Sequence, residues 1–188
     1  MRLTLVRHCE VEEKYLGRYN GHIDIGLSKN GYIQAKKLSH ELKNENYDAV
    51  FCSDLIRAKE SLKYFSNLEN IIYTDRLREK SWGEDEGKTY DEICDSKNIT
   101  YESFEQWISA LGGESIEDFT KRIDEFFFEF LPNLKYENIL IVTHSGVIKT
   151  FLSLYDNITL ENAFCEKINY GDKKTLYFVQ KSNKVILS

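Results

Sequence analysis

The amino-acid sequence predicts one three-layer α/β/α domain built around a mainly parallel sheet. Three short apolar runs are typical of buried strands: residues 3–6 (LTLV), 48–52 (DAVFC) and 138–143 (NILIVT). Stretches with apolar residues at helical spacing separate and follow these runs, and alternating strands and helices indicate a parallel sheet. The 188 residues include no linker, repeat or low-complexity tract, so we expect residues 1–188 to form a single domain.

The helices are predicted from apolar spacing and from the residues that begin them. Ser28 is suited to cap a helix whose apolar residues are Ile33, Ala35, Leu38 and Leu42. A second helix is expected to start at Ser53. Further helical patterns cover residues 90–95, 101–111, 115 to about 134, and 147–154.

Additional strands are predicted at 70–73 and near the C-terminus. The C-terminal candidates are residues 165–170, 175–180 and 184–187, the first two separated by a turn at Gly171-Asp172. These last strands are candidates for antiparallel pairing at an edge of the sheet.

Composition excludes several classes of function. The formal net charge of −6 disfavours nucleic acid as a main partner, although a few arginines can form a local anion pocket. No apolar run approaches the roughly 18 residues that cross a bilayer, and the N-terminus lacks the pattern of a signal peptide. We therefore expect a cytoplasmic protein without a membrane partner. The four cysteines form no CxxC pair, which gives metal and redox motifs little support.

Two histidines and two arginines stand where an α/β sheet gathers its ligands. His8 follows the first apolar run directly, and His144 follows 138–143. Arg7 precedes His8, and Arg57 lies at the start of the helix after 48–52. Ligands of open α/β sheets bind outside the carboxyl ends of the strands, and arginine forks match phosphate oxygens. These four residues indicate a site for a phosphoryl group.

Five sequence blocks resemble the histidine phosphatase superfamily, which includes the cofactor-dependent phosphoglycerate mutases. They are LTLVRHCE (3–10), SDLIRAKES (53–61), LREKSWGEDEG (77–87), GGES (112–115) and IVTHSGVIKTFL (141–152). Their order and spacing match the family from residue 3 to about 155. The resemblance implies a phosphoglycerate mutase-like fold and a phosphomonoesterase that needs no metal or cofactor.

The resemblance also implies a role for each matching residue. His8 would attack phosphorus and form a phosphohistidine. Arg7, Arg57 and His144 would hold the phosphoryl oxygens. Glu79 would protonate the leaving oxygen and then deprotonate water, although Glu84 and Glu86 lie in the same acidic loop.

Two residues depart from the family pattern. Cys9 stands where the family has glycine, which raises the question of strain in the turn after His8. Lys14 falls where many members have an asparagine that contacts phosphate, so it is either a phosphate contact or a solvent-facing side chain.

The substrate is indicated only by resemblance. The loop 16–31 (LGRYNGHIDIGLSKNG) is similar to the substrate-side loop of small bacterial phosphatases, most like the α-ribazole phosphatases of cobalamin biosynthesis. The substrate-side candidates are Lys14, Tyr19, Asn20, Gly21, His22 and Trp82; Tyr90 and Trp107 either extend an aromatic wall or belong to the core.

Other functions stay open at this stage. One is a broad phosphatase for sugar phosphates or nucleotides, a second is a phosphoglycerate mutase, and a third is a non-catalytic module that binds a phosphorylated ligand. In each case the partner is a small phosphorylated molecule. The sequence leaves the oligomeric state open.

Overall fold

A mainly parallel sheet forms the centre of the protein, in a computed structural model that describes residues 1–98 and 100–178. Within these residues the sheet has five strands in the order β3-β2-β4-β1-β5. β1, β4, β2 and β3 are parallel, and β5 is antiparallel to β1 at the edge. The strands are β1 (Arg2–Arg7), β2 (Ala49–Ser53), β3 (Ile71–Thr74), β4 (Asn138–Thr143) and β5 (Lys173–Tyr177).

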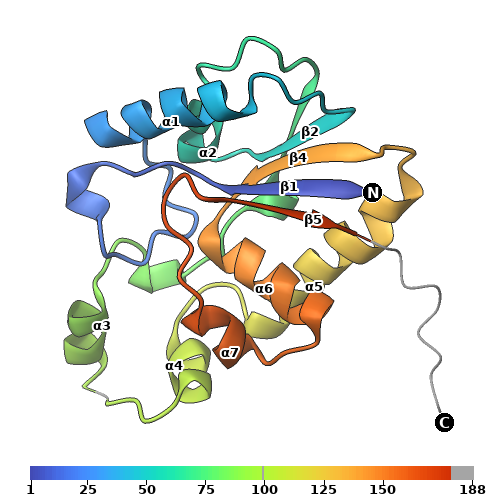
Figure 1. Ribbon diagram of the computed structural model, residues 1–188. Helices are drawn as coiled ribbons and strands as arrows, with labels where there is room; N and C mark the ends of the chain where they lie inside the picture. Colours follow the sequence, from blue (N-terminus) through green and yellow to red (C-terminus); the bar gives the residue numbers. More distant parts are fainter. Residues whose placement is uncertain (99, 179–188) are drawn as a thin grey trace, which may run out of the picture.

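Helices lie on both sides of this sheet (Figure 1). α1 and α2 lie on one side and α5 and α6 on the other, which confirms the predicted three-layer class. The helices are α1 (Lys29–Leu42), α2 (Ile56–Ser61), α3 (Tyr90–Lys97), α4 (Phe104–Ala110), α5 (Ile116–Asp124), α6 (Ser145–Asp156) and α7 (Leu160–Cys165).

The alternation of side chains along the strands produces two cores. Leu3 and Leu5 of β1 point into the core that α5 and α6 cover, where Phe127 stacks on Phe151 with ring centroids 4.2 Å apart. Val6 faces the opposite core, beneath α1 and α2. Because both faces are covered, the central strands are apolar at nearly every position.

The predicted helix starts are partly confirmed. Ser28 caps α1, its Oγ accepting from Gly31 N at 2.9 Å, and Ala35, Leu38 and Leu42 are buried. Ile33, predicted on the same face, is 66% exposed because the turn of the helix places it toward solvent.

Two helix boundaries differ from the prediction. Ser53 is the last residue of β2 and does not begin a helix; α2 starts after Leu55 and ends at Ser61. The long pattern 115–134 is α-helical over α5, then forms a π-helical segment (Glu125–Phe130) and a 3₁₀ turn around Pro132. Proline lacks the donor that a longer α-helix would need.

The prediction of a strand at 165–170 is wrong. Residues 160–165 form α7, with Thr159 Oγ accepting from Asn162 N, and 166–170 form an irregular loop. Short apolar runs do not separate helix from strand by themselves. The antiparallel edge strand is β5, which begins at Lys173 and pairs with β1 as expected. The predicted strand 175–180 overlaps β5 over residues 175–177. Residues 179–180 of that prediction and the whole candidate strand 184–187 lie outside the described residues.

Candidate active site

The two candidate histidines are brought together by the register of the sheet. Arg7 at the end of β1 pairs with Thr143 at the end of β4, so His8 and His144 follow adjacent strand ends. Their ring centroids are 5.0 Å apart. His8 N donates to Thr143 O at 2.8 Å, which ties the two turns together. His144 is fully buried, and its Nε2 lies 2.8 Å from Ser53 Oγ at the end of β2.

The backbone fixes the tautomer of His8. His8 Nδ1 lies 2.8 Å from the carbonyl oxygen of Cys9, and a carbonyl only accepts, so Nδ1 carries the proton. Burial, then the positive charges of Arg57 and Arg7, lower the pKa of His8 well below its ordinary value. A neutral ring with a protonated Nδ1 leaves a lone pair on Nε2. That nitrogen has the electronic form of a nucleophile.

Arg57 is a buried cation held by the backbone of the loop 20–23. Its side chain is 0% exposed, and its guanidinium donates to the carbonyl oxygens of Ile23, Gly21 and Asn20 at 2.8, 2.6 and 3.1 Å. Burial lowers the pKa of Arg57 to about 10, so the group stays charged at neutral pH. Its charge lies near both histidines and lowers the pKa of each.

Glu86 binds the opposite side of the same loop. Its carboxylate accepts from the backbone N–H groups of Gly21, His22 and Ile23, at 2.8, 2.7 and 3.3 Å, and also from Trp82 N at 3.0 Å. The peptide units of 20–23 therefore lie between an anion and a cation. A Cβ at Gly21 would meet Lys80 O at 2.2 Å, so this close approach requires glycine.

Glu79 is placed by the start of α6. Its Oε2 accepts from Gly146 N at 2.9 Å, and its Oε1 accepts from Lys80 N at 3.1 Å. A Cβ at Gly146 would lie 2.1 Å from Glu79 Oε1, so a side chain there would displace the carboxylate. The His22 side chain contacts the backbone of the same residue, with its Nε2 3.1 Å from Glu79 O.

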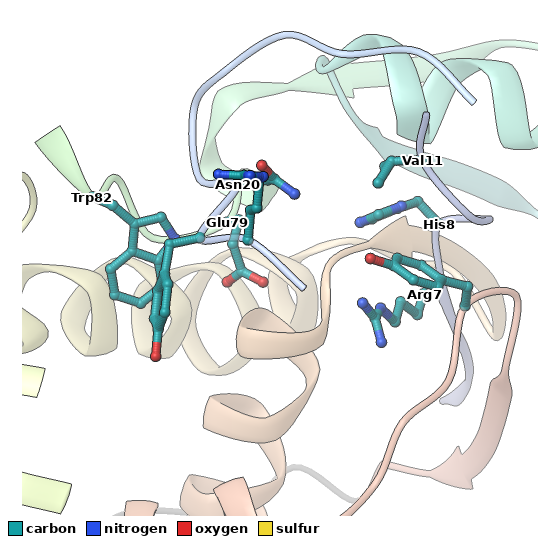
Figure 2. Close-up of a pocket in the computed structure, with 9 residues that line it drawn as sticks. Arg7, His8, Val11, Asn20, Glu79 and Trp82 are labelled. Carbon is teal, nitrogen blue, oxygen red and sulfur yellow. The ribbon is translucent and has the colours of Figure 1, made fainter. Parts of the chain in front are cut away.

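Several of these groups border one cavity of about 140 Å³. Figure 2 shows the His8 ring and the Arg7 side chain on one side of the cavity, with Glu79 and Trp82 on the other. A cation, a neutral imidazole and a carboxylate can thus act on one bound group. The described residues that line the cavity are Arg7, His8, Val11, Arg18, Tyr19, Asn20, Glu79, Trp82 and Tyr170.

The sequence model that describes the histidine phosphatase superfamily (branch 1) matches residues 3–186 of this chain. The chain belongs to this superfamily. This histidine phosphatase is 30% identical to phosphoserine phosphatase 1 of Hydrogenobacter thermophilus over 182 residues, covering 91% of this chain and 85% of the relative. It is also 30% identical to the adenosylcobalamin/alpha-ribazole phosphatase of Salmonella typhimurium over 158 residues, 81% and 78% of the two chains.

A solved structure shares the fold. The alpha-ribazole phosphatase of Shigella flexneri superposes with a TM-score of 0.84 at 25% identity, over 96% of this chain and 92% of that one. Family and relatives together make this protein a phosphatase, that is, a phosphoric monoester hydrolase.

The substrate-side candidates of this histidine phosphatase fall in different places. Tyr19, Asn20 and Trp82 line the cavity, with the Tyr19 and Trp82 rings edge to face at 5.2 Å. Gly21 and His22 are absent from the described lining: both lie in the loop that Glu86 binds, and the His22 ring also contacts Glu79 O. Lys14 is absent from the described lining: its side chain is 68% exposed and pairs with Glu12 at 3.3 Å, consistent with the solvent-facing alternative.

The remaining aromatic and acidic alternatives lie away from the cavity. Neither Trp107 nor Tyr90 is in the described cavity lining. Trp107 packs against the core cluster that contains Trp82 and Ile108, with its ring centroid 5.4 Å from that of Tyr19. Tyr90 is 45% exposed and packs on Trp107, with ring centroids 4.5 Å apart. The Glu84 side chain is 76% exposed beside Lys97. The Glu86 carboxylate accepts hydrogen bonds from the loop 20–23, so Glu79 is the acidic residue of the described cavity wall.

Sequence reasoning missed two polar residues of the cavity. Arg18 comes from the loop before α1 and donates to Gly87 O and to Glu92. Tyr170 precedes the predicted Gly171-Asp172 turn, and its ring lies over the Arg7 guanidinium at 3.8 Å. The turn itself was the only sequence signal for this loop, because its contact with β1 joins positions more than 160 residues apart.

Across 1–98 and 100–178, no group of three or more His, Cys, Asp or Glu residues is arranged to hold a metal ion. No helix in these ranges has both the length and the apolar character that crossing a membrane requires.

The two buried histidines predict a loss of stability in mild acid. Burial and nearby positive charge lower the pKa of both His8 and His144, so the unfolded chain takes up protons below about pH 6.5 while the folded chain does not. The free energy of unfolding should therefore fall between pH 7 and 5.5, approaching about 1.4 kcal/mol per pH unit for each histidine. Denaturant titrations at several pH values measure this slope, and His8→Gln should make it shallower. A flat or rising stability over this interval would contradict the electrostatics described above.

Proposed function

We propose that this protein is a phosphomonoesterase that works through a phosphohistidine on His8 and needs no metal. The observation that carries the proposal is the hydrogen bond between His8 Nδ1 and Cys9 O, which leaves a lone pair on Nε2 of a cavity-lining, neutral imidazole. In the first step Nε2 attacks phosphorus, the bond to the leaving oxygen breaks, and that oxygen takes a proton from Glu79. In the second step Glu79 takes a proton from water, the water oxygen bonds to phosphorus, and the P–N electron pair returns to Nε2.

Three cationic or polar groups would stabilise the transferred phosphoryl group. Arg7 lines the cavity and presents its guanidinium beside His8. Arg57 and His144 lie immediately behind His8, and the Arg57 guanidinium contributes a fixed positive charge. Preorganised charge of this kind stabilises negative charge as it develops on phosphoryl oxygens.

His8→Ala should reduce turnover of p-nitrophenyl phosphate by at least about 1,000-fold, as loss of a covalent nucleophile does in other enzymes. The wild-type protein, quenched during turnover of labelled substrate, should carry an acid-labile, base-stable phosphoryl group that the variant lacks. His40→Ala on α1 is the matched control and should behave as wild type. Turnover by His8→Ala at a rate comparable to wild type would rule out the phosphohistidine.

Glu79→Gln should slow the enzyme most for substrates with poor leaving groups, because those leaving oxygens depend on a proton donor. We expect a loss of about 100-fold for an alkyl phosphate and a much smaller loss of phosphoenzyme formation from p-nitrophenyl phosphate. Glu84→Gln, exposed in the same loop, is the control. If Glu84→Gln shows the leaving-group dependence instead, the assignment of the acid is wrong.

We further propose α-ribazole 5′-phosphate as the preferred substrate. The relatives named adenosylcobalamin/alpha-ribazole phosphatase support this choice, as does the edge-to-face pair of Tyr19 and Trp82 on the cavity wall, which suits a ribose or a base. A relative named phosphoserine phosphatase supports a competing substrate. Broad phosphatase or mutase activity is the remaining alternative.

Phosphate release from a substrate panel distinguishes these choices. The panel contains α-ribazole 5′-phosphate, phosphoserine, nucleoside monophosphates, sugar phosphates and 3-phosphoglycerate. We expect kcat/KM for α-ribazole 5′-phosphate to exceed the others by about 100-fold, or roughly 2.7 kcal/mol in transition-state stabilisation. Preference for phosphoserine, or weak activity on every compound, would refute the α-ribazole proposal and leave the phosphohistidine chemistry unaffected.

A further inference from the structure

Tyr170 lies against two groups of the proposed reaction. The Arg7 guanidinium carbon is 3.8 Å from the centroid of the Tyr170 ring, and the ring centroid of His8 is 5.6 Å away. A cation over an aromatic face at this distance is attracted to it, and the attraction is larger where water is partly excluded. Tyr170 therefore contacts the proposed phosphate ligand and lies beside the proposed nucleophile.

The loop that carries Tyr170 is fastened to the end of β1 by its backbone. Arg7 N donates to Asp172 O at 3.0 Å, and Gly171 N lies 3.2 Å from the carbonyl oxygens of both Arg7 and His8. Asp172 closes the loop on itself, with Oδ2 accepting from Asn169 N at 2.6 Å. Gly171 has a φ of 75°, a conformation that glycine adopts without strain. These hydrogen bonds hold the loop against β1 and so keep the Tyr170 ring beside Arg7.

The Arg7 side chain borders two cavities, so a neighbouring group is needed to keep its guanidinium beside His8. One is the cavity of His8 and Glu79, and the other is a larger one of about 520 Å³ that is also lined by Ser145, Lys149 and Tyr170. Among the described residues, the Arg7 side chain donates to the carbonyl oxygen of Ile168, from the Tyr170 loop, and its Nε has no partner. Without the aromatic ring, the guanidinium could turn away from His8 into the larger cavity.

We propose that Tyr170 is a positioning residue whose aromatic face holds the Arg7 guanidinium beside His8. The inference rests on the proposed function, in which Arg7 binds the phosphoryl group. The ring, rather than the hydroxyl, performs this task. Tyr170 acts through Arg7, so its effect depends on the presence of Arg7.

The experiment compares Tyr170→Ala, Tyr170→Phe and Arg7→Ala, alone and combined, by kcat, KM and the inhibition constant of inorganic phosphate. Tyr170→Ala should weaken phosphate binding and lower kcat/KM by about 10-fold or more, with the melting temperature preserved because the side chain is only half-buried. Tyr170→Phe keeps the aromatic face and should stay within about twofold of wild type. Tyr177→Ala, on the exposed edge strand, is the matched control. In the Arg7→Ala background, Tyr170→Ala should have no further effect.

Each other outcome overturns a defined part of the inference. Tighter phosphate binding by Tyr170→Ala would mean that the ring obstructs the site. Equal losses in Tyr170→Ala and Tyr170→Phe would assign the role to the hydroxyl. An unchanged effect in the Arg7→Ala background would show that Tyr170 acts independently of Arg7. If Arg7→Ala itself leaves phosphate inhibition unchanged, the proposed role of Arg7 fails, and that failure is visible apart from any result at Tyr170.

Discussion

The burial of Arg57 is the constraint on which the rest of the site depends. A guanidinium removed from water is costly unless its donors are satisfied, and its own helix supplies none of the acceptors it uses. The loop 20–23 supplies three carbonyl oxygens, and this requires the loop to turn its N–H groups outward. Glu86 accepts those N–H groups, and Gly21 permits the approach. A single buried charge therefore fixes the loop that carries Tyr19 and Asn20 to the cavity.

Burial, together with the same charge, determines the protonation of the histidines. An imidazolium beside Arg57 and Arg7 in a buried site would meet both desolvation and repulsion, so His8 and His144 stay neutral. The backbone then selects which neutral form His8 adopts, through Cys9 O. In the proposed reaction, positive charge that attracts a phosphoryl group is therefore compatible with a nucleophile that must stay unprotonated. Both requirements are met because the arginines lie near two histidine rings that are themselves buried.

The sequence predicted those parts of the site that follow from strand ends, and missed those that arise from contacts between distant loops. Apolar runs located β1 and β4 almost to the residue, and parallel register then necessarily brought His8 and His144 together. Arg57 and Glu79 were found through their motifs. No periodicity could show that Glu86 binds the loop 20–23, or that the loop before β5 returns to Arg7. The run at 165–170 was misassigned because a short apolar run is compatible with either helix or strand, and tertiary packing decides between them.

Cys9 departs from the family pattern next to the proposed nucleophile without a left-handed backbone conformation. Two backbone groups of Cys9 hold this turn: the carbonyl oxygen, which accepts from His8 Nδ1, and the N–H, which donates to Ser61 Oγ at 2.8 Å. Ser61 Oγ in turn donates to Arg57 O at 2.7 Å, so the turn is connected to the helix of the buried arginine. Cys9 is not among the described non-glycine residues with positive φ, so the turn imposes no left-handed backbone on it. Its side chain is fully buried, and burial raises the pKa of the thiol to about 11, which keeps it protonated and a poor competitor for phosphorus. A side chain that fits the core and leaves the backbone geometry intact can therefore replace glycine without changing the reacting atoms.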